Sequence, residues 1–161
     1  MEITTQDSPT PDSPTQEPST QDRSTQEPST AAPRPQVWGS LQAHDAPALI
    51  DFYVDVLGFL PTAVYADGDT VAHAQLDWPE GGGIMLGSHK PGGEWTREPG
   101  TAGFYVVTDH VDEVHQRVLA AGARVIREPA STDYGSYEFA CVDAEGNYWS
   151  FGTYRGERRQ S

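Results

Sequence analysis

A repeat with regular spacing lies within residues 36–161 and limits the fold more than any other feature. Asp45 precedes an apolar-periodic segment that ends at Gly58, and Asp109 precedes a similar segment that ends at Gly122. Aspartate commonly caps the start of a helix, and glycine commonly follows its end because it tolerates the left-handed backbone conformation. The pattern therefore predicts two helices of about three turns each, in equivalent places of two repeats.

Extended segments flank both helices at nearly the same spacing. The run 37–44 precedes the first helix as 103–108 precedes the second. Further strands are predicted at about 62–66, 70–78 and 83–87, and at about 124–128, 136–142 and 148–154. The sequence thus predicts an α+β fold of two tandem βαβββ units, at about 37–87 and 101–155. Neither unit buries a good core alone, so we expect them to pack together and leave a concave face on the strands.

The first 35 residues differ in composition from the rest of the chain. They contain 7 of the 13 prolines and 12 serines and threonines, but no glycine and no aromatic residue. So few apolar side chains cannot offset the entropy lost on ordering a backbone. We expect residues 1–35 to form a disordered tail, either a partner-binding arm or a solubilising extension, and residues 36–161 to form the folded domain.

The charge of the chain excludes several partners. The formal net charge is −14, of which −10 belongs to residues 36–161, and Lys90 is the single lysine. Nucleic acids and anionic membranes are bound by clustered basic residues, so we expect neither as a partner, and the acidity favours a cationic small molecule. The sequence lacks a membrane-spanning apolar run and a secretory signal, which predicts a soluble, cytoplasmic protein. Cys141, the single cysteine, is expected to be an inert buried thiol.

Two motifs resemble one known family. The run 51–59, Asp-Phe-Tyr-Val-Asp-Val-Leu-Gly-Phe, resembles the first-helix signature of the vicinal oxygen chelate superfamily, which includes glyoxalase I, bleomycin-resistance proteins and extradiol dioxygenases. The run 143–147 is similar to the closing pattern Asp-Pro-Asp-Gly-Asn of that superfamily, with Ala144 where proline is usual. The resemblance covers residues 37–155 and implies a glyoxalase/bleomycin-resistance-type fold.

Enzymes of this superfamily bind a divalent metal through His, Glu or Gln side chains. The resemblance assigns the corresponding positions to Trp38, Gly103, Gln75 and Ser150. An indole, a hydrogen, a carboxamide and a hydroxyl make a poor site for a divalent metal. We therefore expect no metal ion and no other cofactor, and a metal-dependent glyoxalase or dioxygenase activity is disfavoured.

Strand alternation indicates which residues line the cavity that the resemblance implies. His73, Gln75 and Asp77 share one side of a strand, and the resemblance implies that this is the cavity side. The predicted ligand-binding residues are Trp38, Gln42, His73, Gln75, Trp95, Tyr105, Tyr148 and Ser150. Trp95 belongs to segment 87–100, which either closes over the cavity or forms an exposed linker. His73 is interpreted as a ligand contact, a cavity-wall residue or a general base, whereas His110 and His115 are expected to be solvated.

Three functions follow as hypotheses. Resemblance to bleomycin-resistance proteins implies a homodimer that sequesters a small organic molecule without metal and without turnover, and the acidic charge favours a cationic one. The alternative is a metal-free isomerase or lyase acting on a small organic substrate, with His73 or Asp77 moving a proton. The third is an accessory protein whose cavity is closed by Trp38 and whose tail conducts its function.

Overall fold

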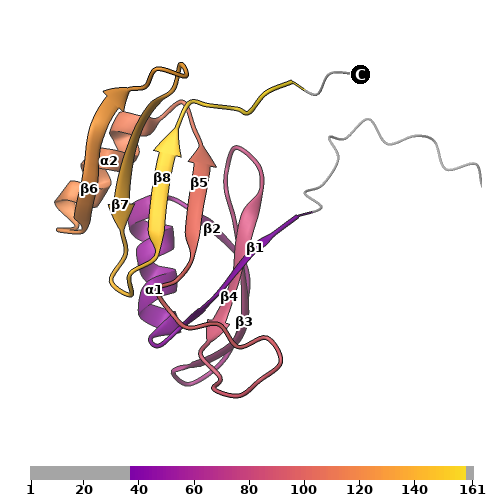
Figure 1. Ribbon diagram of the computed structural model, residues 1–161. Coiled ribbons are helices and arrows are strands. Elements are labelled where there is room, and N and C mark those ends of the chain that lie inside the picture. The colour runs from indigo at the N-terminus through magenta and orange to yellow at the C-terminus, as the bar shows by residue number, and fades with distance from the viewer. Residues whose placement is uncertain (1–36, 159–161) are drawn as a thin grey trace, which may run out of the picture. The chain divides into compact units, whose positions relative to one another are not determined.

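The computed structural model describes residues 37–158 (Figure 1). The tail predicted at residues 1–35 lies outside the described residues. The elements in chain order are β1 (Gly39–Ala43), α1 (Ala46–Phe52), η1 (Tyr53–Leu57), β2 (Leu60–Asp67), β3 (Thr70–Asp77), β4 (Gly83–Ser88), β5 (Gly103–Val107), α2 (Val111–Ala120), β6 (Arg124–Ser131), β7 (Tyr137–Val142) and β8 (Tyr148–Gly152).

The strands form two four-stranded sheets of identical topology. Their orders are β1-β4-β3-β2 and β5-β8-β7-β6. In each sheet the first two strands run parallel and the other neighbours run antiparallel. Pro61 and Pro129 lie in the edge strands β2 and β6, where a residue without a backbone N–H is tolerated. The prediction of two tandem βαβββ units in an α+β fold is confirmed.

The first predicted helix begins as expected but changes its winding. The Asp45 side chain accepts a hydrogen bond from the backbone N–H of Ala48 at 3.1 Å, so Asp45 is the N-cap. After Phe52 the chain continues as the π-helical turn η1 and ends at Gly58, whose φ is 98°. The prediction of one regular helix is therefore wrong for its second half.

The second helix departs from the sequence prediction at its start. α2 begins after His110, which makes no side-chain cap, while Asp109 forms an ion pair with Arg155 at 2.5 Å. The predicted capping role of Asp109 is therefore wrong. His110 is exposed as expected, but His115 is only 7% exposed and its ring packs against Phe139. His115 lies one turn after Val111 on the helix face that covers the sheet, which explains its burial.

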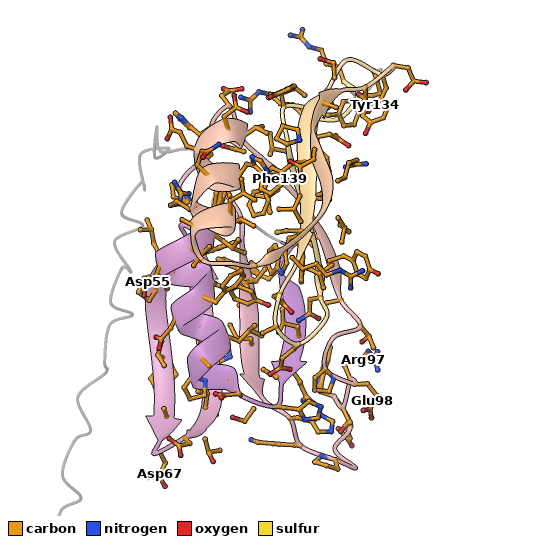
Figure 2. The ribbon with its side chains drawn as sticks, turned by 90° about the vertical axis from the view of Figure 1, so that its left-hand side faces the viewer. Asp55, Asp67, Arg97, Glu98, Tyr134 and Phe139 are labelled. Carbon is orange, nitrogen blue, oxygen red and sulfur yellow. The ribbon has the colours of Figure 1, made fainter. Side chains whose placement is uncertain are left out.

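One hydrophobic core joins the two repeats. Trp149 of β8 is fully buried, and its ring centroid lies 4.8 Å from that of Tyr53 and 5.6 Å from that of Phe59, both in the first repeat. Helix α1 packs on β1, β3 and β4, and α2 packs on β6, β7 and β8 (Figures 1 and 2). The helices thus cover one face of each sheet, and the opposite, concave faces remain available for a site.

Two further sequence expectations concern this domain. Cys141 lies in β7 as a free, fully buried thiol, and burial raises its pKa to about 12.

Between residues 37 and 158, no helix combines the length and the apolar character that crossing a bilayer requires.

Candidate functional site

The strand register shows which concave-face positions are equivalent in the two repeats. In the first sheet Met85 pairs with Ser40 and Gln75. In the second sheet Ser150 pairs with Tyr105 and Ala140. The counterpart of Ser150 is therefore Met85 on the fourth strand, and the two metal-ligand positions that the sequence assigned to Gln75 and Ser150 are not equivalent.

The side chains at these positions do not fit a divalent metal. The paired positions of the two sheets offer hydroxyl groups, one carboxamide and one thioether, and Gly103 offers no side chain. Across residues 37–158, no three His, Cys, Asp or Glu side chains are grouped so that they hold a metal ion. This donor set is unsuited to Zn, Fe or Ni, so we assign no step to a metal, and the expectation of metal-free binding stays a prediction.

A cavity of about 410 Å³ lies on the concave face of the first sheet. Its floor is apolar and includes Ala72 and Met85. Its polar and aromatic lining comprises Ser40, Gln42, His73, Lys90, Trp95 and Arg97. The structure therefore brings together three of the predicted ligand-binding residues, which are Gln42, His73 and Trp95.

The loop between β4 and β5 borders this cavity. The Gln42 side-chain oxygen lies 3.1 Å from Nδ1 of His89 and accepts a long hydrogen bond from the backbone N–H of Lys90. The Thr96 hydroxyl donates to the Lys90 carbonyl at 2.6 Å and folds the loop back on itself. Trp95 then lies at the cavity edge with 77% of its surface exposed. Its indole is a free contact surface rather than part of the core.

The other predicted residues of the first repeat lie outside this cavity lining. The Gln75 amide donates a 2.9 Å hydrogen bond to the Asp77 carboxylate. Trp38 lies against Gly83, so closely that a Cβ at Gly83 would be 2.5 Å from the indole. The structure thus separates the two catalytic candidates, because His73 lines the cavity and Asp77 is engaged by Gln75.

The concave face of the second sheet carries Tyr105, Tyr148 and Ser150 around a buried carboxylate. Glu138 is 2% exposed and accepts hydrogen bonds from Tyr105 at 3.2 Å, and from Arg127 and Tyr134 at 2.6 Å each. Arg127 also donates to the Ser150 hydroxyl at 2.9 Å, which ties a predicted ligand residue into the same cluster. Tyr148 lies nearby and is 57% exposed.

The hydrogen bonds to Glu138 determine its protonation state. Burial alone raises the pKa of this carboxyl, but hydrogen bonds from Tyr134, Ser136 and Tyr105 and the Arg127 charge outweigh it. The net effect is a pKa below the ordinary value of 4.5. Glu138 is therefore ionised at neutral pH, and its charge is balanced by Arg127.

Four residues of the two faces were missed by the sequence analysis: Lys90, Arg97, Arg127 and Glu138. For Glu138 the sequence did carry a signal, because the repeat that aligns residue 71 with residue 136 also aligns Glu138 with the predicted site residue His73. Lys90 and Arg97 gave no such signal, since they lie in a glycine-rich loop without periodicity. Their place at the cavity follows from the folding of that loop.

Comparisons with known proteins agree with this architecture. The model of the Glyoxalase/Bleomycin resistance protein/Dioxygenase superfamily matches residues 36–151. The chain is similar to the crystal structure of TioX from Micromonospora sp. ML1, with 25% identity and a TM-score of 0.59 over 72% of this chain and 97% of that one. No curated protein matches the chain.

Two further solved structures share the fold at lower identity. A virulence protein from Salmonella typhimurium is 19% identical, with a TM-score of 0.53 over 75% of this chain and 98% of that one. A protein from Sphaerobacter thermophilus DSM 20745 is 21% identical, with a TM-score of 0.51 over 72% of this chain and 95% of that one. At these identities the likeness concerns the fold alone.

Proposed function

Because the chain belongs to the glyoxalase/bleomycin resistance protein/dioxygenase superfamily, we propose that it binds and sequesters a small organic molecule without a metal ion. The observation that carries the proposal is the cavity on the first sheet. Its volume of about 410 Å³ lies in the range of small-molecule sites. An apolar floor with a few polar side chains at the edge suits a compact, partly aromatic ligand.

A homodimer is part of this proposal. The first cavity and the open surface around Tyr148 belong to different sheets and share no lining residue. Each surface is open and leaves a large aromatic side chain exposed, Trp95 on one and Tyr148 on the other. A second copy that places its second sheet over the first cavity would cover both side chains and enclose the ligand.

A metal-free isomerase or lyase is the second candidate, and the position of His73 favours it. His73 lies in the cavity lining, and its ring stacks on Tyr65 with centroids 6.3 Å apart. An imidazole held in a cavity can transfer a proton at neutral pH. Asp77 is not a partner for this step, because it accepts a hydrogen bond from Gln75 and does not line the cavity.

The binding proposal is tested with 2-naphthylmethanol, a flat neutral probe. We expect saturable binding in calorimetry that is unchanged by EDTA, with the probe recovered intact. Ala72→Trp fills the cavity floor and should weaken binding at least about fivefold. Ala120→Trp, at an exposed position of α2, is the matched control and should bind as the wild type does. Absence of saturable binding would count against the proposal.

The enzyme alternative has its own readout. The protein is incubated with a small-molecule extract, and the compounds are compared by mass spectrometry before and after. If the wild type converts a compound and His73→Ala does not, the result supports the isomerase or lyase. A general base contributes about 10²–10⁴-fold in rate. Enrichment of an unchanged compound on the protein supports sequestration.

A further inference from the structure

We propose that the first cavity selects an organic anion, namely a flat aromatic body that carries a carboxylate or phosphate group. This inference rests on the binding function proposed above and names its ligand class. The observation that carries it is the charge of the lining, which includes Lys90 and Arg97 but no aspartate or glutamate. Residues 36–161 hold 18 acidic side chains, so the lack of a carboxylate at this surface is distinctive.

The two cations of the lining are not neutralised by neighbouring carboxylates. Among the residues that the structure describes, neither Lys90 nor Arg97 has a carboxylate oxygen within 4.0 Å, whereas Arg127 pairs with Glu138 and Arg155 with Asp109. Arg97 donates one hydrogen bond, to the adjacent Thr96 carbonyl at 3.3 Å. Its other N–H groups and the Lys90 ammonium are available to a ligand.

The loop conformation places these two cations at the same cavity. Lys90 is anchored at its backbone by Gln42 and by the Thr96 hydroxyl. Arg97 follows Thr96 directly, and Figure 2 shows Arg97 beside Glu98 on this loop. Glu98 does not line the cavity. The lining thus includes both basic residues of the loop, and its acidic residues, Glu94 and Glu98, lie outside it.

The acidity of the whole domain does not overrule this local charge. At physiological ionic strength the Debye length is about 8 Å, so exposed carboxylates farther away act weakly on a ligand in the cavity. Asp77, the one acidic residue of β3, accepts the Gln75 hydrogen bond and is outside the lining, and so are Glu94 and Glu98 of the loop. The lining therefore does not support the expectation of a cationic ligand, which came from net charge alone.

The remaining lining specifies the body of the ligand. Met85 supplies apolar contact, and the exposed Trp95 indole offers a flat surface for stacking. Arginine binds carboxylate or phosphate through parallel N–H groups, and lysine adds a point charge. A planar compound with one anionic group matches both features of the cavity.

The test compares three probes that share one ring: naphthalene-2-carboxylate, 2-naphthylmethanol and 2-naphthylmethylammonium. Binding to the full chain is measured by equilibrium dialysis at low and at physiological salt. We expect the carboxylate to bind about tenfold or more tightly than the ammonium compound, with the difference reduced by salt. 2-Naphthyl phosphate, measured in the same way, shows which of the two anionic groups is preferred.

Variants then test which side chains cause the preference for the anionic probe. Lys90→Ala and Arg97→Ala should each weaken binding of naphthalene-2-carboxylate about three- to tenfold, and should weaken binding of 2-naphthylmethanol less, because that probe carries no charge for the two cations to bind. The double variant Lys90→Glu/Arg97→Glu should reverse the preference toward the ammonium compound. Arg124→Ala removes the same charge from a position outside this lining and is the matched control. All of these positions are exposed, so folding is not at risk.

The outcomes separate this inference from the function on which it rests. Equal binding of the three naphthalene probes, or a preference for the ammonium compound, overturns the anion inference and leaves the binding function standing. A carboxylate preference that persists in Lys90→Glu/Arg97→Glu also overturns it. Failure of all the probes to bind overturns both proposals.

Discussion

The Tyr53 hydroxyl donates a 2.6 Å hydrogen bond to the carboxylate of Asp143, 90 residues later in the chain. Tyr53 begins the π-helical turn of the first repeat, and Asp143 begins the turn between β7 and β8 of the second. Asp143 also accepts hydrogen bonds from the side chains of Asn147 and Trp149. The bond therefore links the two repeats within their shared core.

Removing this link should destabilise the domain without changing its fold. Tyr53→Phe leaves Asp143 with fewer donors and should lower the free energy of unfolding by about 1–2 kcal/mol. Asp143→Ala strands the buried polar atoms of Tyr53, Asn147 and Trp149 and should lower it by about 3 kcal/mol or more. Urea denaturation measures both. Tyr65→Phe is the control, because Tyr65 is exposed, and a loss there equal to that of Tyr53→Phe would contradict the assignment.

Local sequence signals were sufficient for the strands and for most helix ends. Gly58 and Gly122 end their helical segments with φ values of 98° and 68°, because a residue without Cβ adopts that conformation freely. Asp109 does not cap the second helix, because α2 begins one residue later, after His110, and the Asp109 carboxylate pairs with Arg155, 46 residues later in the chain. A contact between such distant positions carries no local pattern.

The site was predicted less completely, for a similar reason. Strand alternation found His73 and Gln42, since side chains at every second position share a face. It also placed Gln75 on that face, yet the Gln75 amide turns to Asp77 instead of the cavity. Residues outside regular strands, such as Lys90, depend on loop hydrogen bonds that alternation does not describe.

The ionised state of Glu138 should appear in the pH dependence of stability. Its pKa is lower in the folded protein than its ordinary value of 4.5, so its stabilising contribution is present above that value and is lost as pH falls through the folded pKa. Glu138→Gln should be less stable at neutral pH and should lose less stability on acidification. Denaturation midpoints between neutral pH and about pH 3 measure this. Asp55→Asn, an exposed control, should keep the acid response of the wild type.

Cys141 should be unreactive in the folded protein. Burial, and secondarily the charge of Asp143, raises its pKa from 9.0 to about 12, so almost no thiolate exists near neutral pH. We expect slow reaction with a thiol reagent such as dithionitrobenzoate at about pH 8 and rapid reaction in urea. Because the folded pKa is the higher one, stability should fall as pH rises through 9 toward 12. Rapid, complete labelling of the native protein would refute the assignment.

Trp95 and Trp38 should differ in their effect on ligand binding. Trp95 lines the first cavity and is exposed, whereas Trp38 lies against Gly83 outside the lining. Trp95→Ala should therefore weaken binding of 2-naphthylmethanol about fivefold, the effect of losing one aromatic contact. Trp38→Ala should change it less than about twofold. Calorimetric titration of both variants decides the matter, and the reverse order would place the ligand elsewhere on the concave face.

The proposed homodimer predicts that a charge on the second concave face separates the subunits. Tyr148 is 57% exposed there, and a second copy that covers the surface would bury its ring. Tyr148→Lys would then place an ammonium group against the basic lining of the covered cavity and should raise the dimer dissociation constant at least about tenfold. Leu119→Lys, at a 46% exposed position of α2 on the helical side, is the control and should leave dimerisation unchanged. Sedimentation velocity over a range of concentrations reports both. A monomeric wild type would refute the homodimer, and dissociation caused by Leu119→Lys alone would place the interface on the helices.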